Sequence, residues 1–259
     1  MKENIVKEGR CYIGTSGWSY SHWSKGVFYP RGMKSGEWLP FFSQRFSTVE
    51  INSSFYRLPS SEMFKRWRDV TGDGFQFAVK LWRRVTHERK LANCTRELKD
   101  FFTAAAELEP KLGPLLIQLP PFLKCNLELL DGFLSELNNA TVETRWNVTV
   151  EFRNTEWLCE PVYQLLNRYD VSLCLADMPR CPITEPNNAS FVYIRRHGPG
   201  GTYSGCYSPE EIAGDAGRIR EWLREGRDVY VYYNNDIDGH AVTNAGQLIE
   251  AVNIKLENG

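Results

Sequence analysis

NVTVEFRN (147–154) alternates apolar with polar side chains and ends in a polar cluster. Successive side chains of a β-strand point to opposite faces, so this run predicts a strand with Glu151 and Arg153 together on its polar face. Seven further runs have a similar form: CYIGTSGW (11–18), TVEINSSF (48–55), FQFAVKLW (75–82), GPLLIQLP (113–120), SLCLAD (172–177), FVYIRRHG (191–198) and DVYVYYNND (228–236). Helix-length stretches separate most of them, and strands that alternate with helices pair in parallel. Eight such units in 259 residues predict an α/β fold, a single (β/α)8 TIM barrel.

The segments between the runs carry the apolar spacing of helices. We expect helices over 36–46, 60–70, 94–110, 127–139, 161–170, 208–225 and 241–253. Ser60 and Ser208 stand where a side-chain oxygen caps the first N–H groups of a helix. Only a Pro-rich connection follows the sixth run, so its helix should be short or missing and the barrel irregular there. No low-complexity linker divides the chain, which predicts one barrel domain over 1–259.

The composition is ordinary for a globular protein, with 42% apolar and 24% charged residues. A formal net charge of −1 provides no overall attraction to nucleic acid or to an anionic membrane, but it leaves room for a local basic patch. The seven cysteines include no CxxC pair, which favours reduced thiols in a cytoplasmic protein. MKENIVKEGR (1–10) lacks the apolar core of a secretory signal, and no apolar run approaches the roughly 20 residues that span a bilayer. Nothing in the sequence points to an oligomeric state.

Polar side chains gather at the carboxyl ends of the predicted strands, where TIM barrels place their chemistry. The alternation of each run directs these residues toward the barrel axis: Ser16, Glu50, Asn52, Lys80, Gln118, Glu151, Arg153, Asp177, Arg195, His197 and Asn234. Because all eight runs contribute, we predict a binding or catalytic pocket at this end. The alternative is a buried network in which the charges only satisfy one another.

The charges of this set are balanced, with three carboxylates facing three permanent cations and one histidine. Burying a charge costs several kcal/mol unless it is paired, so an apolar core would be cheaper and the balanced set favours a functional role. Nearby cations also compete with a metal ion for the carboxylates. We therefore predict no metal, with a site built from Glu50, Glu151, Asp177 and His197 as the alternative. Neither GxxxxGK[ST] nor GxGxxG after a strand occurs, and no cofactor is predicted.

Two kinds of catalytic group stand out among these residues. His197 is a candidate general acid–base, since the ordinary pKa of histidine is close to neutrality. Glu50 and Glu151 are a candidate pair of catalytic carboxylates. The loop HGPGGTYSG (197–205), which includes Gly200, follows the seventh run, where barrels often bind phosphate through backbone N–H groups. The alternative for this loop is a flexible turn.

Aromatic and basic residues also fall in the predicted loops at this end. Trp18 and Tyr56 either stack on a base or a sugar or form a roof over the barrel mouth. A basic stretch after the third run faces either a polyanion or solvent, and it contains Arg83, Arg84, Arg89 and Lys90.

Nine segments, in order along nearly the whole chain, carry a family resemblance: IGTSGWSY (13–20), VEINSSFYRLPS (49–60), FAVKLWRRVTH (77–87), LLIQLPP (115–121), VEFRN (150–154), LCLAD (173–177), RRHG (195–198), TYSGCYS (202–208) and VYYNNDIDGHAVTNA (231–245). Together they resemble the YecE-like family, TIM barrels known as a domain of unknown function. The resemblance implies one barrel domain and bacterial or archaeal relatives, and it supports Trp18, Tyr56 and Tyr203 beside all of the inward-facing residues. Arg196 departs from the pattern, which has an apolar residue there; its alternation predicts a side chain pointing outward, toward the helices.

The leading hypothesis is an enzyme that binds a small anionic, phosphate-bearing ligand and hydrolyses a phosphoester or a nucleic acid. Lys80, Arg153, Arg195 and the loop at 197–205 would hold the anion.

In the same hypothesis His197 or Glu151 transfers protons, and Glu50 with Asn52 orients the substrate. One alternative is a sugar-active barrel, glycosidase-like or isomerase-like, that uses Glu50 and Glu151 with a tryptophan platform. The other is a non-catalytic module that binds single-stranded nucleic acid across its top face.

Overall fold

The computed structural model describes residues 7–141, 144 and 146–253. Residues 1–6, part of the segment predicted to lack a secretory signal, lie outside the described residues, as do both ends of the predicted domain over 1–259. No helix in the described part of the chain is both long enough and apolar enough to cross a membrane.

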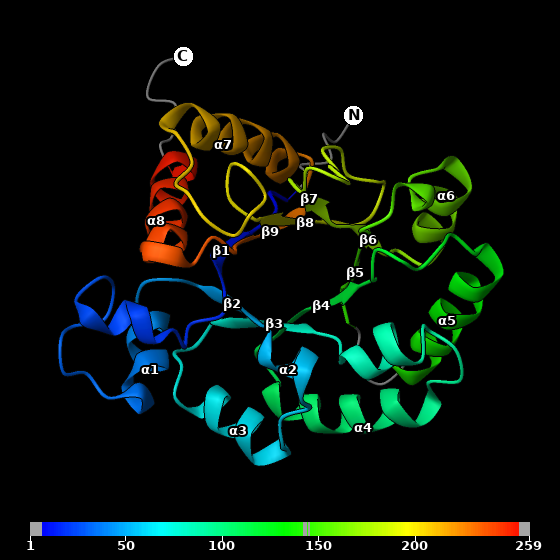
Figure 1. Cartoon of the computed structure of the whole chain (residues 1–259), viewed down its shortest axis with the longest axis horizontal. Helices are drawn as coiled ribbons and strands as arrows, with labels where there is room; N and C mark the ends of the chain where they lie inside the picture. Colours follow the sequence, from blue (N-terminus) through cyan, green and yellow to red (C-terminus); the bar gives the residue numbers. More distant parts are fainter. Residues whose placement is uncertain (1–6, 142–143, 145, 254–259) are drawn as a thin grey trace, which may run out of the picture.

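The described chain forms one sheet of parallel strands that curls into a barrel with helices around it (Figure 1). The strands are β1 (Cys11–Ser16), β2 (Thr48–Ile51), β3 (Gln76–Lys80), β4 (Leu112–Gln118), β5 (Val148–Glu151), β6 (Ser172–Leu173), β7 (Leu175–Ala176), β8 (Phe191–Arg196) and β9 (Asp228–Tyr233). Their order in the sheet is β6-β5-β4-β3-β2-β1-β9-β8-β7. The predicted α/β TIM barrel is confirmed, with its eight runs in the expected places.

The barrel is irregular at the sixth run, as the sequence predicts. This run divides at Cys174 into β6, which pairs with β5, and β7, which pairs with β8. The amide of Cys174 still donates to the carbonyl of Val150 at 2.9 Å, on the β5 side. One short run thus changes its hydrogen-bonding partner part-way along and brings the two edges of the sheet together.

Helices follow most strands and cover the outside of the barrel. They are α1 (Trp38–Ser43), α2 (Ser53–Tyr56), α3 (Ser61–Asp69), α4 (Thr95–Ala105), α5 (Leu127–Ala140), α6 (Glu160–Arg168), α7 (Pro209–Arg224) and α8 (His240–Asn253). Ser60 accepts a hydrogen bond from the Met63 amide and Ser208 accepts one from the Glu211 amide, so both predicted caps are present. Between β7 and β8 the described chain has no helix, and an antiparallel bridge joins Ala176 to Ile183 instead.

Several short segments are helical where the sequence predicted none, and two of them follow neighbouring strands. The four-residue α2 follows β2 directly, and a π-helical turn over Arg84–Glu88 follows β3. Both lie at the carboxyl end of the barrel. Such single turns are too short to produce a repeating apolar pattern, so the periodicity of the sequence does not reveal them.

Two layers of inward-facing side chains fill the barrel. The lower layer is a cluster of aromatic, aliphatic and thiol groups: Tyr12, Ala78, Leu116, Cys174, Phe191, Tyr193, Tyr230 and Tyr232. Above it lies an upper layer in which three side chains, Lys80, Gln118 and Arg195, each follow a residue of the lower layer by two positions. The pairing between strands adds the rest, since Glu151 is the partner of Gln118, and Ser16 is the partner of Glu50. The upper layer therefore consists of Ser16, Glu50, Lys80, Gln118, Glu151 and Arg195. Val49, Val79 and Val150 alternate with these residues and are fully buried in the core outside the barrel.

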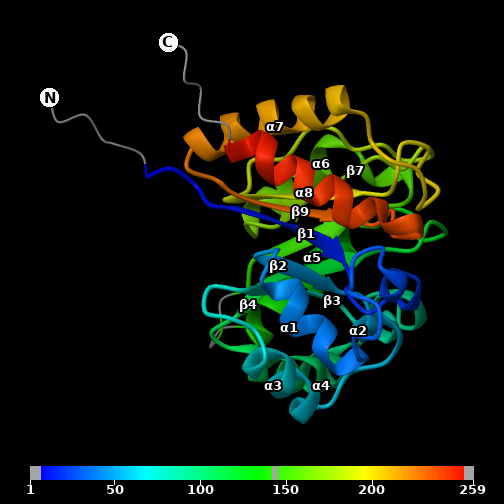
Figure 2. The ribbon, with the colours of Figure 1, turned by 90° about the vertical axis from the view of Figure 1, so that its left-hand side faces the viewer.

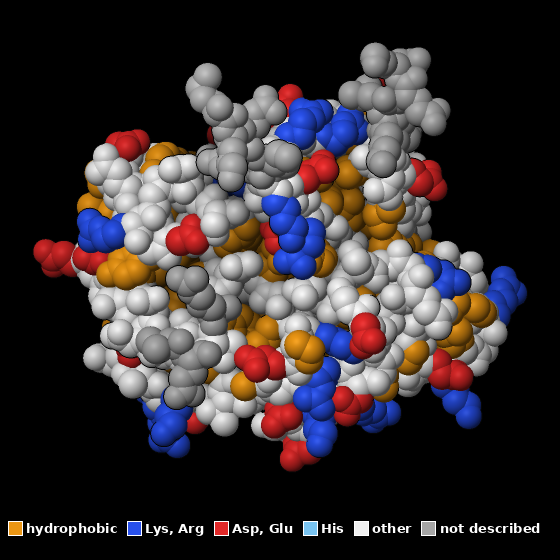
Figure 3. Space-filling view, turned by 180° about the vertical axis from the view of Figure 1, so that it is seen from behind, with side chains coloured by type: hydrophobic (Ala, Val, Ile, Leu, Met, Phe, Trp, Pro, Cys, Tyr) orange, Lys and Arg blue, Asp and Glu red, His pale blue; other side chains and the backbone are white. Residues whose placement is uncertain are grey.

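The two ends of the barrel differ in what they present. Figure 2 shows β1 beginning and α8 ending at the same end of the barrel. On the face opposite to the view of Figure 1, basic and acidic side chains are scattered among one another (Figure 3). The paired charges of the upper layer are therefore a feature of the other end of the barrel, where the strands end.

Candidate functional site

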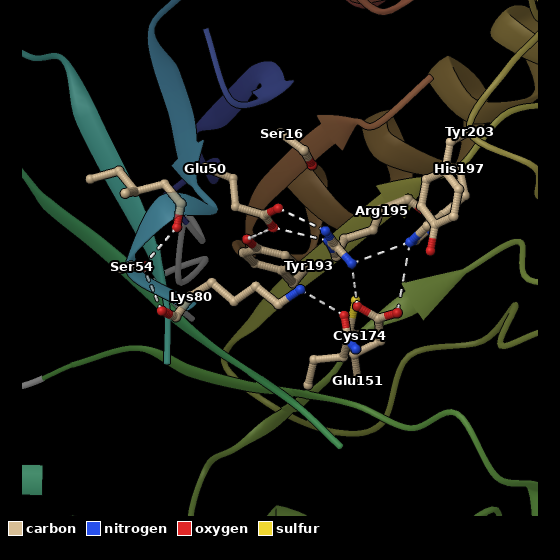
Figure 4. Close-up of polar contacts among 12 residues, drawn as sticks. Ser16, Glu50, Ser54, Lys80, Glu151, Cys174, Tyr193, Arg195, His197 and Tyr203 are labelled. Carbon is tan, nitrogen blue, oxygen red and sulfur yellow. Dashed lines mark hydrogen bonds and ion pairs between the residues drawn. The ribbon is translucent and has the colours of Figure 1, made fainter. Parts of the chain in front are cut away.

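Arg195 lies between Glu50 and Glu151 at the centre of the upper layer (Figure 4). Its Nε and Nη2 donate to the two carboxylate oxygens of Glu50 at 3.0 and 2.8 Å, and its Nη1 donates to Oε2 of Glu151. At most 1% of each of these three side chains is exposed. The hydroxyl of Tyr193 also donates to Glu50 Oε2, at 2.7 Å. One guanidinium from β8 thus serves carboxylates from β2 and β5.

This arrangement keeps both carboxylates ionised. Burial alone would raise the pKa of each, but the ion pair with Arg195 outweighs it. The pKa of Glu50 therefore lies below its ordinary value, and that of Glu151, which also pairs with Arg153, lies well below. A general acid needs the opposite shift, so neither carboxylate is set up to donate a proton.

His197 lies beside this network, and its surroundings define its tautomer. Its Nε2 is 3.0 Å from Nη2 of Arg153 and 3.2 Å from Nη1 of Arg195. Guanidinium nitrogens only donate, so Nε2 must accept and Nδ1 carries the ring proton. Nδ1 lies 3.4 Å from Oδ1 of Asp177. Burial, with help from both arginines, lowers the pKa of His197 despite Asp177, so the ring is neutral near pH 7.

Asp177, directly after β7, holds the start of the next loop in place. It accepts hydrogen bonds from the backbone amide of His197 at 2.8 Å and from the hydroxyl of Tyr207. That hydroxyl in turn accepts from the amide of Gly198 at 2.7 Å. Asp177 therefore orients His197 and its loop from beside the upper layer.

A pocket of about 520 Å³ opens above the upper layer. It is lined by Tyr20, Asn52, Phe55, Tyr56, Lys80, Arg83, His87, Gln118, Arg153, Arg195, Tyr203 and Asn234. These residues come from the ends of seven strands, β1 to β5, β8 and β9, or from the segments that follow them. The pocket is therefore at the end of the barrel where this fold carries its chemistry.

Lys80, the last residue of β3, is a lining residue whose pKa is strongly changed by its surroundings. Its Nζ donates to Oε1 of Gln118 at 2.7 Å and lies 4.3 Å from the centre of the Phe55 ring. Only 8% of the residue is exposed. Burial, reinforced by the positive charge of Arg195, lowers the pKa of Lys80 from 10.5 to about 7. The pocket thus holds an amine that is partly uncharged at neutral pH.

The structure brings most of the predicted site residues together. Eight of them line the pocket: Asn52, Tyr56, Lys80, Gln118, Arg153, Arg195, Tyr203 and Asn234. Four more are buried beneath or beside the lining: Ser16, Glu50, Glu151 and His197. This placement agrees with the alternation in the sequence, while the catalytic and binding roles of these residues stay predictions.

Trp18, a predicted substrate-binding residue, lies outside this pocket. It lines a neighbouring pocket of about 590 Å³ next to α1 and α3, and its ring meets Trp67 edge-on at 5.2 Å. Gly17, with φ of 99°, turns the chain in a conformation that a side chain would strain. The tryptophan consequently leaves the barrel axis and packs between helices. Tyr20 and Asn52 belong to both pockets and separate them.

Gly200 also lies outside the pocket lining, so the predicted phosphate cradle is not part of this pocket. The amides of its neighbours are already used within the molecule. Gly201 donates to the carbonyl of Gly198 at 2.7 Å, and Tyr203 donates to the carbonyl of His197 at 2.7 Å. The loop folds on itself, and its tyrosine rather than its glycines reaches the pocket.

Arg196 points outward, as its alternation predicts. Its guanidinium pairs with Asp215 on α7 and lies 3.9 Å from Asp177. The departure from the family pattern at this position therefore adds an ion pair between the barrel and a helix. It leaves the direction of Arg195 and His197 unchanged.

Four lining residues were not among the predicted site residues: Tyr20, Phe55, Arg83 and His87. All four follow strand ends, in loops or short helical turns. Their residue types gave a partial signal, since aromatic and basic residues cluster after the first and third runs. No repeating pattern fixes the direction of a side chain in such segments, so their convergence could not be read from alternation.

The alternative metal site does not form in the described part of the chain. No group of three or more His, Cys, Asp or Glu side chains is arranged there to hold a metal ion. Arg195 and Arg153 occupy the oxygens of Glu50 and Glu151 that a metal would need. All seven cysteines are free thiols.

Comparison with known proteins places this barrel in a family. Residues 12–258 match the model described as "Protein of unknown function DUF72". The chain belongs to this family. The resemblance seen in the sequence is thereby confirmed.

Relatives of this DUF72 chain cover most of its length. The Bacillus subtilis (strain 168) UPF0759 protein YunF is 26% identical over 277 residues, covering 94% of this chain and 95% of that protein. The Escherichia coli (strain K12) UPF0759 protein YecE is 31% identical over 159 residues, covering 61% of this chain and 54% of that protein. A crystal structure of a DUF72 family protein from Thermotoga maritima MSB8 superposes with a TM-score of 0.82 and 27% identity, covering 93% and 98% of the two chains.

Proposed function

We propose that this DUF72 barrel binds a small anionic, phosphate- or carboxylate-bearing ligand in the pocket above the upper layer. One observation carries the proposal. The described residues that line the pocket include Lys80, Arg83, Arg153 and Arg195, and none of them is an aspartate or a glutamate. A cavity with several basic groups and no acidic group on its wall attracts anions.

The position of the carboxylates explains how the wall becomes positive in a chain with a net charge of −1. Glu50 and Glu151 are fully buried beneath the wall and are turned toward Arg195 and Arg153. Those two guanidiniums still line the pocket while they neutralise the carboxylates. Arginine has five N–H donors, so it can hold a carboxylate on one side and an anion on another.

Two titratable groups in the wall respond to this positive field. Arg195 adds to the effect of burial in lowering the pKa of Lys80, and Lys80 with Arg83 adds to burial in lowering the pKa of His87. An anion in the pocket would oppose these effects and favour the protonated forms. Ligand binding should therefore be accompanied by proton uptake near pH 7.

Phosphoester hydrolysis stays a prediction without this kind of support. His197 accepts from Arg153 and Arg195 through the nitrogen that a general base would use. Glu151 is held ionised by the same arginines. The paired-carboxylate mechanism of a sugar-active barrel has less support still, since Glu50 and Glu151 both have lowered pKa values and share one guanidinium.

A specific observation favours one alternative, a module that binds single-stranded nucleic acid. Tyr56 and Phe122 are 72% and 62% exposed, and Phe122 lies 6.5 Å from His87 and 5.7 Å from Nζ of Lys90. Exposed rings beside basic groups can stack on bases while the cations meet phosphates. In this alternative, affinity for an oligonucleotide depends steeply on salt and falls in Phe122→Ala.

Titration calorimetry with inorganic phosphate at fixed ionic strength tests the main proposal. We expect Arg153→Gln to weaken phosphate binding about tenfold or more, because it removes a charge-assisted hydrogen bond. Arg153 suits the test better than Arg195, since Glu151 keeps Arg195 as its partner in the variant. Arg96→Gln is the matched control, because Arg96 is 89% exposed and lies on α4, away from the pocket.

The outcomes separate cleanly. Equal affinity in Arg153→Gln and Arg96→Gln, or no binding of phosphate by the wild-type protein, contradicts the anion site. Proton uptake on binding sulfate, which does not titrate near pH 7, supports it; heats that change with the ionisation enthalpy of the buffer then report protonation of the protein.

A further inference from the structure

Lys80 is the cation of the upper layer that lacks a carboxylate of its own. Each guanidinium of the network pairs with at least one glutamate, but among the described residues no carboxylate lies within 4.0 Å of the Lys80 amine. Its polar contact is the neutral side chain of Gln118, and the ring of Phe55 covers another side. A buried ammonium with no counter-charge is costly, so this environment favours the free amine.

The free amine is a nucleophile, and its surroundings set how much of it exists. The charged groups that act on it most strongly are Arg195 and Arg153, which oppose its protonation, and Glu151 and Glu50, which favour it. Together with burial they bring the pKa of Lys80 to about 7, so roughly half of the amine is uncharged at pH 7. Lysines made reactive in this way form covalent adducts with carbonyl substrates.

Arg153 and Arg195 line the same pocket as Lys80. A ligand can therefore bind these guanidiniums through its anionic group and place an adjacent atom close to Nζ of Lys80. The pocket volume of about 520 Å³ is within the range of ~300–1,000 Å³ that is usual for small-molecule sites. The ligand chemistry that uses both features is a carbonyl group close to a carboxylate or a phosphate.

We propose that Lys80 forms a Schiff base with the carbonyl carbon of a small anionic oxo compound, a 2-oxo acid or a phosphorylated ketone or aldehyde. This inference rests on the anion-binding function proposed above and names the substrate class of that site. Gln118 positions the amine through its hydrogen bond, and Phe55 stabilises the positive iminium through its ring face.

The covalent step needs no additional reactant. The lone pair of Nζ attacks the carbonyl carbon, the C=O π bond opens, and the oxygen takes up a proton to give a carbinolamine. The nitrogen lone pair then expels this oxygen as water once it gains a second proton. Starting from the protonated lysine, the products are one iminium ion and one water molecule, so protons and electrons balance.

Reductive trapping tests the proposal on the full chain. The protein is incubated at pH 7 with sodium cyanoborohydride and either pyruvate, dihydroxyacetone phosphate or acetone, which lacks an anionic group. Intact mass spectrometry measures the adduct, and peptide mapping locates it. We expect one adduct at Lys80 with pyruvate or dihydroxyacetone phosphate, formed about tenfold or more faster than with acetone.

Lys80→Arg should lose the adduct while it keeps a positive charge in the pocket wall. The exposed Lys65 and Lys99 serve as internal controls in the same peptide map, since neither lines the pocket. Lys80→Met is a second variant, for the case that the larger guanidinium prevents folding.

The inference is overturned if labelling spreads over surface lysines, if Lys80→Arg is trapped as fast as the wild-type protein, or if acetone reacts as fast as pyruvate. Its failure can be told apart from failure of the anion site. If phosphate binding depends on Arg153 but no adduct is trapped at Lys80, only the Schiff-base proposal is contradicted. Loss of both signals sinks the anion site as well.

Discussion

The two layers inside the barrel come from the same strands, but apolar packing stabilises the lower layer and ion pairs stabilise the upper one. Tyr193 and Arg195 are two residues apart on β8, and Leu116 and Gln118 are two apart on β4. The lower layer is filled by rings and aliphatic groups, with Tyr12 stacked on Tyr230 at 4.7 Å. The upper layer consists mainly of buried ions: Glu50, Lys80, Glu151 and Arg195. Packing alone closes the lower half of the barrel, so closure of the barrel does not explain the ions above it.

The cost of the upper layer leads to a functional interpretation. Burying a carboxylate or a guanidinium costs several kcal/mol per ion, and pairing repays this only when the geometry is good. The bidentate contact of Arg195 with Glu50 is such a geometry. The comparison teaches that these ions hold one another in fixed positions. We infer that their function is to make the pocket wall above them positive.

The largest effect that tests this contrast is expected from Arg195→Met. The substitution leaves two ionised carboxylates buried and removes the partner that they share. Breaking a buried pair by removing one member costs about 3–5 kcal/mol, so we expect a loss of that size in the free energy of unfolding. Urea unfolding at pH 7 measures it. A loss below about 1 kcal/mol would mean that the network is not a coupled unit.

A variant without any of the three charges separates stability from function. Glu50→Gln, Glu151→Gln and Arg195→Met combined should recover most of the lost free energy, since replacing a whole buried ion network is often neutral or stabilising. The combined variant should nevertheless bind phosphate more weakly than the wild-type protein, because the pocket wall has lost the guanidinium of Arg195. Recovered stability together with wild-type binding contradicts the proposal that this network creates the anion site.

The strand part of this contrast was predictable from the sequence. Alternation within the runs placed Glu50, Glu151 and Arg195 on the inner faces, and the structure has them there. It also predicted Arg196 on the outer face, where it pairs with Asp215. A period of two survives in strands of only a few residues, because each neighbouring strand fixes the direction of every side chain.

The loop part could not be predicted in the same way. Trp18 leaves the barrel axis after the left-handed turn at Gly17, and Gly200 is turned away because its neighbours bond within their own loop. Conversely, Tyr20 and His87 reach the pocket from loops and turns. Their positions depend on hydrogen bonds between segments far apart in the sequence, such as that from the indole of Trp23, in the same loop as Tyr20, to the Asp236 carbonyl, and no local pattern encodes these.

The next effect in size concerns the pH dependence of stability, which the upper layer should have through Lys80. The charged or titratable groups that face this amine are Arg195, Arg153, Glu151, Glu50 and His87. In the unfolded chain Lys80 holds its proton up to its ordinary pKa of 10.5, whereas in the folded protein it loses the proton around 7. The unfolded state thus binds more protons between these values, so stability from this group rises with pH across that window.

The prediction is a difference between two proteins. From pH 7 to pH 9 the wild-type protein should gain about 2 kcal/mol in unfolding free energy relative to Lys80→Met, since one pH unit corresponds to about 1.4 kcal/mol for one proton. The subtraction removes the contributions of cysteines and tyrosines that titrate in both proteins. Parallel curves for the two proteins over this range would show that the pKa of Lys80 is not lowered.

The smallest effect compares one substitution made in both environments. Tyr193 and Tyr232 belong to the lower layer and both are buried, but the hydroxyl of Tyr193 reaches up to the carboxylate of Glu50, whereas that of Tyr232 meets the hydroxyl of Thr48, each at 2.7 Å. Hydrogen bonds to charged groups are worth about 1.5–3 kcal/mol and neutral ones about 0.5–1.5 kcal/mol. We therefore expect Tyr193→Phe to lower the unfolding free energy by about 1 kcal/mol more than Tyr232→Phe. Both variants keep the ring and its packing, so the difference isolates the acceptor. Equal losses would mean that the carboxylate of Glu50 gains nothing from its tyrosine and that the two layers are energetically independent.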